Sequence, residues 1–408
     1  MAHIVCYAVL SLTSLAVSVR DHGAVGDAAT DDTAAVRAAL AESSHVHFPA
    51  GVYRITDGLD LPPGTRLTGE GSPALAPFPM IGDDKRRLAP EKKATLPGTV
   101  LLFTGRGGAR QSTGRTDAFA SLRYAMRTTP DSSFTVRDLA IVCDIDVHDR
   151  DGRLTPPDAD RRADYDVGLL VDDSFAGTVR DVSVFGYWNR AGVAVVSRGV
   201  GDNPDYNAFW NCAIMGDVGV ALLGRDDAPG PETSGPETPG PGLSGTQFHG
   251  CRIFAGDHHD RRRGGAGRAA VYIDGDTPAK RADINGHAFF GGCIRTYANT
   301  AVELDHASNV SFHGVVFEVP AYRVKVKPRD APEPPPVVPE SSADDVAPGR
   351  ERPGRITGTA NTRDVFFFGC RMHDLKIREL AESMTDGRVY AFPGPFDQPV
   401  VHPPPPRR

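Results

Sequence analysis

Two segments of the chain share an apolar pattern and carry carboxylates at the same places in it. They are residues 271–274 and 302–305, in which Asp274 and Asp305 occupy matching positions. If the apolar residues point inward and the segments form neighbouring strands, the two carboxylates lie about 5 Å apart on the outer surface. Two carboxylates at that separation suit a retaining glycosidase, with one as nucleophile and the other as acid and base.

The neighbours of this pair are predicted to bind the substrate. Tyr272 and Glu303 match one another in the same way as the two aspartates, and His306 follows Asp305. Two other roles stay open for the aspartates. They could hold a calcium ion through their oxygens, or they could belong to a solvated polar face on which aspartate forms turns.

A second set of candidates occupies the x position of a repeated Phe-x-Gly-Cys pattern. In chain order these residues are Trp210, His249, Gly291, His313 and Phe368. His249 and His313 would lie about 10 Å apart, two repeats from one another, with Arg252 nearby. A polysaccharide lyase needs a base to remove the proton next to a uronate carboxylate, and cations to neutralise that carboxylate. These side chains could supply both, or the rings could instead pack beneath a loop.

The two tryptophans, Trp188 and Trp210, are also predicted to contact substrate, because aromatic rings offer a flat apolar face with specific geometry. Packing on neighbouring repeats is the alternative for both. The full set of predicted substrate-binding residues is Arg252, Tyr272, Glu303, His306, Trp210 and Trp188.

The elements that must position these residues repeat along the chain. Strands of the Phe-x-Gly-Cys type alternate with short strands rich in glycine, alanine and valine. Steps of 11 residues separate Cys293, Leu304 and Val315, which gives a period of 22 residues, within the range of stacked repeat proteins. Longer repeats contain insertions. Four cysteines fall at one repeat position, and we interpret them as small buried hydrophobic residues rather than as a metal ladder. They are Cys212, Cys251, Cys293 and Cys370.

The N-terminal part of the chain predicts a short helix followed by strands. Asp31 and Asp32 precede a run of good helix formers, with Val36, Ala39 and Leu40 along one face. Turn residues then separate several short apolar segments.

Residues 20–71 carry Gly-Ala-Val-Gly-Asp, Asp-Asp-Thr and Phe-Pro-Ala-Gly-Val-Tyr runs. This segment resembles the N-terminal signature of the pectate-lyase-like, glycosyl-hydrolase-28-related superfamily. The resemblance implies a right-handed parallel β-helix whose open end is capped by the helix at residues 31–43. It contains none of the family's catalytic residues. Asp172 and Asp173 superficially resemble the Asp-Asp pair of polygalacturonase-type hydrolases, but the other motifs of that family are absent, so they receive no role.

The repeat and the resemblance together predict an all-β fold, a single-stranded right-handed parallel β-helix with an N-terminal capping α-helix. The β-helix domain is expected at residues 19–392, with flexible insertions at about 75–96, 226–245 and 327–354. Residues 1–18 are a candidate signal or N-terminal extension, and residues 393–408 are a proline-rich tail.

Charge and composition narrow the range of partners. The 408 residues carry a net charge of −7, so the broad basic field of a nucleic-acid-binding protein is absent. No apolar run reaches the roughly 20 residues that span a membrane. The six cysteines show no zinc-type spacing, and the sequence therefore predicts no definite cofactor, with Ca²⁺ as the candidate.

These observations predict a carbohydrate-active enzyme that cleaves an acidic polysaccharide along the β-helix wall, as a lyase or a glycoside hydrolase. The alternatives are a non-catalytic, glycan-binding protein similar to a phage tail spike, and a sugar epimerase or isomerase. The expected partner is a polysaccharide or oligosaccharide. A monomer is expected, with a trimer as the alternative. Secretion is the candidate localisation, and a cytoplasmic protein stays open.

Overall fold

The fold is known from a computed structural model. The parts of the chain that it describes are residues 16–72, 98–105, 110–113, 118–143, 165–186, 188–197, 206–224, 243–255, 269–274, 284–296, 300–305, 307–318, 355–358, 363–372, 389–392 and 401–402.

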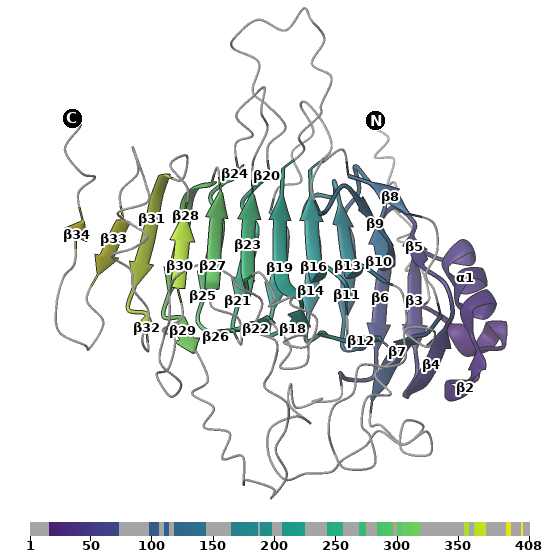
Figure 1. The fold of residues 1–408 in the computed structure, drawn as a ribbon. Helices are drawn as coiled ribbons and strands as arrows, with labels where there is room; N and C mark the ends of the chain where they lie inside the picture. Colours follow the sequence, from purple (N-terminus) through teal and green to yellow (C-terminus); the bar gives the residue numbers. More distant parts are fainter. Residues whose placement is uncertain are drawn as a thin grey trace, which may run out of the picture.

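Within these residues the strands form three long sheets, A, B and C, and one two-stranded hairpin, β8 (Gln111–Ser112) with β9 (Ser121–Leu122). The chain passes from sheet C to A to B and back to C, and each turn stacks on the one before (Figure 1). The strand pairs of the long sheets are parallel, except that the last strand of sheet A runs antiparallel. The fold is therefore a single right-handed parallel β-helix, as the sequence predicts.

Sheet A contains β1 (Val17–Ser18), β3 (His45–Phe48), β6 (Arg66–Gly69), β11 (Thr135–Arg137), β14 (Thr178–Arg180), β17 (Ala208–Trp210), β20 (Leu243–Ser244), β21 (Gln247–His249), β24 (Ile284–Asn285), β25 (Ala288–Phe290), β28 (Ala307–His313), β31 (Arg363–Phe368), β33 (Val389–Phe392) and β34 (Val401–His402).

Sheet B contains β2 (Asp27–Asp31), β4 (Gly51–Ile55), β7 (Thr99–Phe103), β12 (Ala140–Cys143), β15 (Ser183–Phe185), β18 (Ala213–Gly216), β22 (Arg252–Ala255), β26 (Cys293–Thr296), β29 (Val316–Glu318) and β32 (Arg371–Met372). Sheet C contains β5 (Leu59–Leu61), β10 (Tyr124–Thr128), β13 (Val167–Asp172), β16 (Ala191–Val196), β19 (Val218–Leu223), β23 (Val271–Asp274), β27 (Thr300–Asp305) and β30 (Arg355–Gly358).

The predicted Phe-x-Gly-Cys strand is in fact two strands that meet at a sharp corner between sheets A and B. In each such coil the residue after the sheet A strand has a left-handed backbone, for example Asp181 (φ 53°), Asn211 (φ 50°) and Gly250 (φ 63°). Aspartate, asparagine and glycine tolerate this region better than other residues. The glycine of the pattern therefore marks the corner.

Five phenylalanines stack inside the solenoid on successive strands of sheet A. Ring centroids of neighbours lie 4.8 to 5.1 Å apart with interplanar angles of 5° to 14°. They are Phe209, Phe248, Phe289, Phe312 and Phe367, and all are buried.

One coil departs from the predicted alignment. The sequence pattern places Phe290 inside, but Phe289 occupies the stack and Phe290 points outward. The cause is an extra corner residue, because both Gly291 and Gly292 have positive φ there. A Cβ atom on Gly292 would lie 2.0 Å from the carbonyl oxygen of Cys251, so the backbones meet too closely for any other residue.

The predicted cysteine column is correct for three of its four members. Cys212 and Cys251 are buried free thiols just after the corner, and Cys370 is half-buried at the equivalent place. The Sγ atom of Cys251 donates to the carbonyl oxygen of Phe209 in the preceding coil, 3.4 Å away. Cys293 lies one place later, because Gly292 fills the column in that coil. The cysteines are packing residues rather than a metal ladder.

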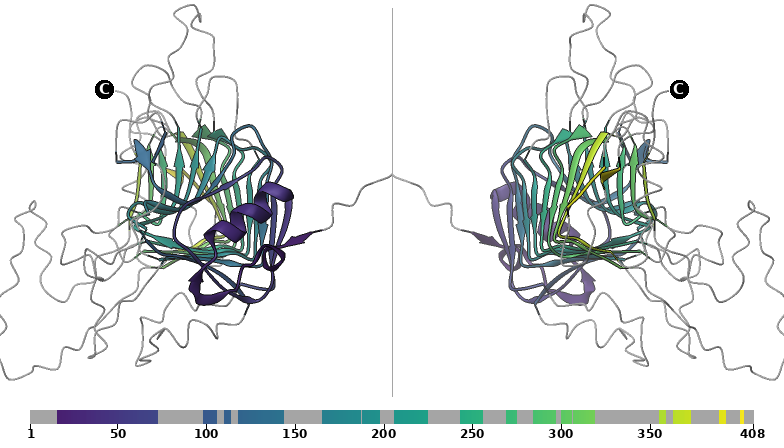
Figure 2. Two further views of the ribbon diagram at one scale, coloured as in Figure 1. Left: turned by 90° about the vertical axis from the view of Figure 1, so that its right-hand side faces the viewer. Right: turned by 90° about the vertical axis from the view of Figure 1, so that its left-hand side faces the viewer.

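The N-terminal end of the solenoid is covered by α1 (Thr33–Glu42), which follows the 3₁₀ helix η1 (Val19–His22). Figure 2 shows α1 lying across this end of the coil. The predicted face of Val36, Ala39 and Leu40 is buried against the first coils, as helix periodicity requires. The carboxylate of Asp32 accepts hydrogen bonds from the backbone N–H groups of Val25 (2.7 Å) and Gly26 (3.1 Å), which fixes the turn before the helix.

The predicted insertions at 75–96 and 327–354 lie outside the described residues. The insertion at 226–245 overlaps β20, and the tail at 393–408 includes β34, which pairs with β33. Val17 and Ser18, at the end of the predicted N-terminal extension, form β1 and pair with β3. No helix in the described ranges is long and apolar enough to cross a membrane.

One interior column is polar. Asn207, Thr246 and His287 occupy equivalent positions in successive coils of sheet A. The backbone carbonyl of each accepts a hydrogen bond from a backbone N–H group in the next coil. Within the part of the chain that the structure describes, neither ring nitrogen of the fully buried His287 makes a hydrogen bond of good geometry, although the backbones of Leu243 and Thr246 lie close to them. Burial lowers the pKa of His287 to about 4.

This buried imidazole should make the fold sensitive to acid. The unfolded chain binds a proton at the ordinary histidine pKa of about 6.5, whereas the folded chain binds it only near pH 4, so stability falls as the pH drops through that window. A shift of this size corresponds to about 3 kcal/mol. Urea unfolding of the wild-type protein and of His287→Leu at pH 7 and pH 5 measures this contribution. We expect the variant to lose less stability on acidification, and an equal loss in both proteins would contradict the prediction.

Candidate functional site

The outer face of sheet C is an apolar strip with polar groups at its two ends. The register aligns Leu170, Ala194 and Ala221 in one outward column, and all three are fully buried. They belong to an apolar cluster separate from the solenoid core. Outward residues of a solenoid wall are buried only if something covers the wall, so this face is not an open surface.

Part of that cover is the flap, which we define as residues 110–113 and 118–122. Phe119 comes five residues before β10, yet its ring stacks on Tyr272 in β23, four strands away along sheet C, with centroids 5.8 Å apart. Leu122 of the same segment joins the apolar cluster. The flap therefore crosses the outer face of sheet C from one polar end to the other.

The C-terminal end of the strip holds the predicted carboxylate pair. Asp274 and Asp305 are in register on β23 and β27, and Tyr272 is in register with Glu303. In-register residues on neighbouring strands lie about 4.8 Å apart. The hydroxyl of Tyr272 donates a hydrogen bond to Oδ2 of Asp274. The structure thus brings together the pair that the sequence predicts.

The predicted exposure of this site needs correction. Asp274 is only 4% exposed and Tyr272 1%, whereas Glu303 and Asp305 are half-buried. Both buried residues point away from the solenoid interior as expected, but Phe119 of the flap lies over Tyr272. At 4% exposure, Asp274 itself offers almost no surface to a substrate in this conformation. His306 lies outside the described residues.

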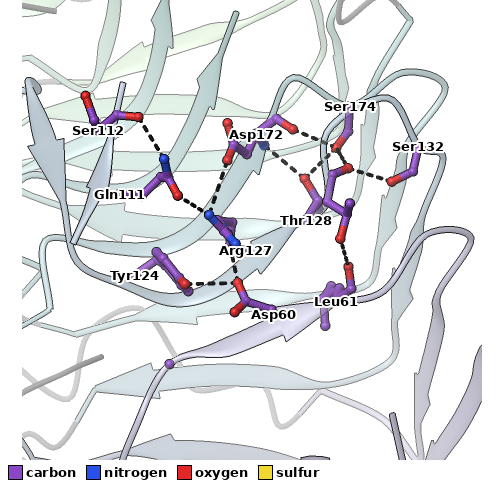
Figure 3. Close-up of polar contacts among 12 residues, drawn as sticks. Asp60, Leu61, Gln111, Ser112, Tyr124, Arg127, Thr128, Ser132, Asp172 and Ser174 are labelled. Atoms are coloured by element: carbon purple, nitrogen blue, oxygen red, sulfur yellow. Dashed lines mark hydrogen bonds and ion pairs between the residues drawn. The ribbon is translucent and has the colours of Figure 1, made fainter. Parts of the chain in front are cut away.

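The N-terminal end of the strip carries a second polar cluster, which sequence reasoning missed. Figure 3 shows the Arg127 side chain between the carboxylates of Asp60 and Asp172. Arg127 Nε donates to Asp60 Oδ1 at 2.8 Å, and Arg127 Nη1 lies 3.8 Å from Asp172 Oδ2. The Tyr124 hydroxyl donates to the same Asp60 oxygen at 2.9 Å, and Gln111 of the flap accepts from Arg127.

The two carboxylates of this cluster differ in their contact with water. The Asp60 side chain is well exposed, whereas that of Asp172 is buried, and Arg127 stabilises both charges. Burial, followed by the hydrogen bond to Asp60, raises the pKa of Tyr124 to about 12, so it remains a donor at any ordinary pH. A single charged residue between apolar neighbours, as in Leu59-Asp60-Leu61, is the sequence signal that could have identified this end.

His249 and His313 lie on another wall, the outer face of sheet A, in one column of aligned rings. Successive pairs stack face to face at 3.7 Å for Trp210 and His249 and at 4.6 to 4.8 Å for the others. We call this column, Trp210, His249, Phe290, His313 and Phe368, the outer ring stack. Phe290 takes the place predicted for Gly291, which turns the corner instead.

The stacking defines what the two imidazoles can do. Burial lowers the pKa of both His249 and His313, so both are neutral at neutral pH. The Nε2 atom of His249 lies 3.0 Å from Oε1 of Gln247. Since neighbouring rings cover both faces of each imidazole, only the ring edges can meet a ligand. Arg252 is exposed on sheet B, beyond the corner from His249.

The prediction for Trp188 is wrong. Its side chain is 2% exposed and packs in the solenoid core, with its ring centroid 6.5 Å from that of Tyr165. A ring in the core cannot stack on a substrate. Trp210, in contrast, is 43% exposed.

The described residues contain no group of three or more histidine, cysteine, aspartate or glutamate side chains placed to hold a metal ion. If Asp274 and Asp305 bind a calcium ion, the described part of the chain therefore supplies no third histidine, cysteine, aspartate or glutamate ligand.

Comparisons with known proteins agree with this architecture. Residues 16–77 match the family model described as "Rhamnogalacturonase A/epimerase, pectate lyase-like". The match covers the N-terminal part of the chain, and the right-handed parallel β-helix that follows it is the fold that the resemblance to the pectate-lyase-like superfamily implies.

Individual relatives cover smaller parts of the chain. A glucan 1,3-beta-glucosidase of Cochliobolus carbonum is 31% identical over 126 residues, which is 30% of this chain and 16% of that protein. The pre-neck appendage protein of Bacillus phage phi29 is 37% identical over 70 residues, 17% of this chain and 8% of that protein. The chain thus spans less than a fifth of either relative.

Among solved structures, ORF18 of Geobacillus virus E2 has a TM-score of 0.49 at 14% identity, with 92% of this chain and 60% of that chain covered. The Dettilon tailspike protein has a TM-score of 0.42 at 12% identity, covering 87% of this chain and 62% of that chain.

The flap should be separable from the solenoid core. In Phe119→Ala the ring over Tyr272 is lost, and we expect faster amide hydrogen exchange in residues 118–124 with a small change in the global melting temperature. Phe248→Ala removes a ring of the same size from the inner stack and should cost about 3–5 kcal/mol of global stability. If both substitutions lower the global melting temperature equally, the flap is part of the folding core and the prediction is wrong.

Proposed function

We propose that this protein is a carbohydrate-active enzyme, a glycoside hydrolase that cleaves a polysaccharide on the outer face of sheet C. The single observation that carries the proposal is the in-register pair of Asp274 and Asp305 on neighbouring parallel strands. A strand spacing of about 4.8 Å suits the separation of about 5–5.5 Å between the carboxyl groups of retaining glycosidases.

The surroundings of the pair suggest a role for each carboxylate. Asp274 is buried and oriented by the Tyr272 hydroxyl, so we assign it as the nucleophile that bonds to the anomeric carbon. Asp305 is half-buried and nearer to water, so we assign it as the acid and base. Asp305 first protonates the leaving oxygen, then takes a proton from the water that hydrolyses the glycosyl-enzyme.

The charge of this face favours a substrate without carboxylates. On strands β5 to β27 of sheet C, the outward side chains include the carboxylates of Asp60, Asp172, Asp274, Glu303 and Asp305, whereas the ion pairs of Arg127 reach only Asp60 and Asp172. Like charges across an interface oppose binding. A neutral glycan therefore fits this site better than the acidic polysaccharide expected from sequence. The name of the Cochliobolus carbonum relative, a glucan 1,3-beta-glucosidase, supports that preference.

A lyase acting on an acidic polysaccharide is the second candidate, and it would use sheet A. The observation in its favour is that His249 and His313 are neutral, as a base must be, on a face that also exposes Arg137 and Arg180. Ring faces covered by stacking limit this role to the imidazole edges. We propose an extracellular or surface setting for either activity, since the relatives include phage appendage proteins.

The hydrolase proposal predicts that Asp274→Asn and Asp305→Asn each lower kcat by at least about 100-fold with folding intact, because each removes a group that touches the reacting atoms. Reducing-end release from a panel of neutral glucans measures the activity, and circular dichroism checks the fold. Tyr272→Phe is the matched control, since it keeps the ring beneath Phe119 and removes only the hydroxyl; we expect a loss of about tenfold.

Three outcomes separate the candidates. Reducing ends without ultraviolet absorbance support hydrolysis, and unsaturated uronate products support the lyase. Glycan binding without turnover on any glycan of the panel would overturn both and leave a non-catalytic binding protein.

A further inference from the structure

The outer ring stack on sheet A has a free end at Trp210. His249, Phe290 and His313 each have a ring partner on both faces. Among the described residues, Trp210 stacks on His249 alone, at 3.7 Å and 5°, and remains 43% exposed. Its second face therefore looks along the solenoid axis toward the preceding coil.

The residue next to that face is Arg180, which is in register with Trp210 on β14. Its guanidinium turns sideways to Asp181, with Nε 3.1 Å from Oδ2, and among the described residues no guanidinium lies over the Trp210 ring. Asn211 Nδ2 donates to Asp181 Oδ1 at 2.6 Å. Arg180 is 67% exposed at its side chain, so its remaining N–H groups face water.

We propose that the open face of Trp210 and the polar rim of Arg180, Asp181 and Asn211 form a saccharide-binding subsite. A pyranose ring has a face rich in C–H groups, which packs on an aromatic ring whose π-face is negative. Its hydroxyls both donate and accept, and the rim offers guanidinium donors beside carboxylate and amide oxygens. The choice of a saccharide as the ligand rests on the proposed function, whereas the geometry of the subsite does not.

The subsite is preorganised, which favours binding. His249 holds the indole flat, and two hydrogen bonds hold the rim, so little side-chain freedom is lost when a ligand arrives. It lies on sheet A, whereas the carboxylate pair lies on sheet C. The subsite would therefore hold a polysaccharide away from the site of cleavage.

The sequence supplies a direct probe, because the chain has two tryptophans and Trp188 is buried. The experiment measures acrylamide quenching of tryptophan fluorescence in the full chain during titration with neutral β-1,3-glucan oligosaccharides, and separately with oligogalacturonates. We expect one of these to protect Trp210 from quenching, and the two titrations distinguish a neutral from an acidic saccharide. If Trp188→Phe folds, its fluorescence comes from Trp210 alone. Otherwise the Trp210 signal is obtained by subtracting the fluorescence of Trp210→Phe from that of the protein with both tryptophans.

Variants test the composition of the subsite by isothermal titration calorimetry. Trp210→Ala should weaken binding at least about thirtyfold and Arg180→Ala about tenfold. Phe175→Ala, which removes another exposed aromatic ring outside the rim, should leave the affinity unchanged. All titrations use the Asp305→Asn background, so that cleavage does not enter the measurement and a failure of the proposed cleavage does not count against the subsite.

The proposal is overturned if no oligosaccharide alters the quenching of Trp210, or if affinity persists in both Trp210→Ala and Arg180→Ala. Equal loss of affinity in Phe175→Ala would also overturn it, because binding would then follow general surface hydrophobicity.

Discussion

The structure depends on one constraint, the in-register stacking of parallel strands about 4.8 Å apart. The inner column of Phe209, Phe248 and Phe289 satisfies this spacing almost ideally, since neighbouring rings lie 4.8 Å apart and nearly parallel. Stacked aromatic rings contribute beyond the area that they bury. Each coil must therefore place a residue that fits the column in register with its neighbours. The coil with Gly291 and Gly292 has one extra residue, and it places that residue at the corner between sheets A and B.

The same register turns the outside of the solenoid into columns of like side chains. On sheet C it brings Asp274 beside Asp305, and on sheet A it brings His249 between Trp210 and Phe290. Residues far apart in sequence thus become neighbours without any dedicated loop. The candidate functional groups therefore lie on the outer faces of the sheets. The two faces differ, because sheet C carries a column of carboxylates and sheet A carries a column of aromatic and imidazole rings.

Burial decides which of these columns can act. The flap packs Phe119 on Tyr272, and Asp274, two residues further along the same strand, is also buried, while Trp210 at the end of the outer ring stack is 43% exposed. A buried carboxylate is shielded from water, which suits a reacting group. An open indole face suits binding. The predicted roles of Trp188 and Trp210 looked equivalent in sequence, yet one ring lies in the core and the other on the surface.

The sequence by itself determined the β-helix, its N-terminal cap and the pairing of Asp274 with Asp305, because apolar periodicity and corner residues are local properties that repeat. It predicted one strand where there are two, since a left-handed residue such as Asn211 bends the chain without interrupting the apolar pattern. Only the tertiary structure decided that Phe289 rather than Phe290 is inside, that Asp60 and Asp172 share Arg127, and that the flap covers sheet C. These features depend on contacts between segments whose separation in sequence carries no fixed period.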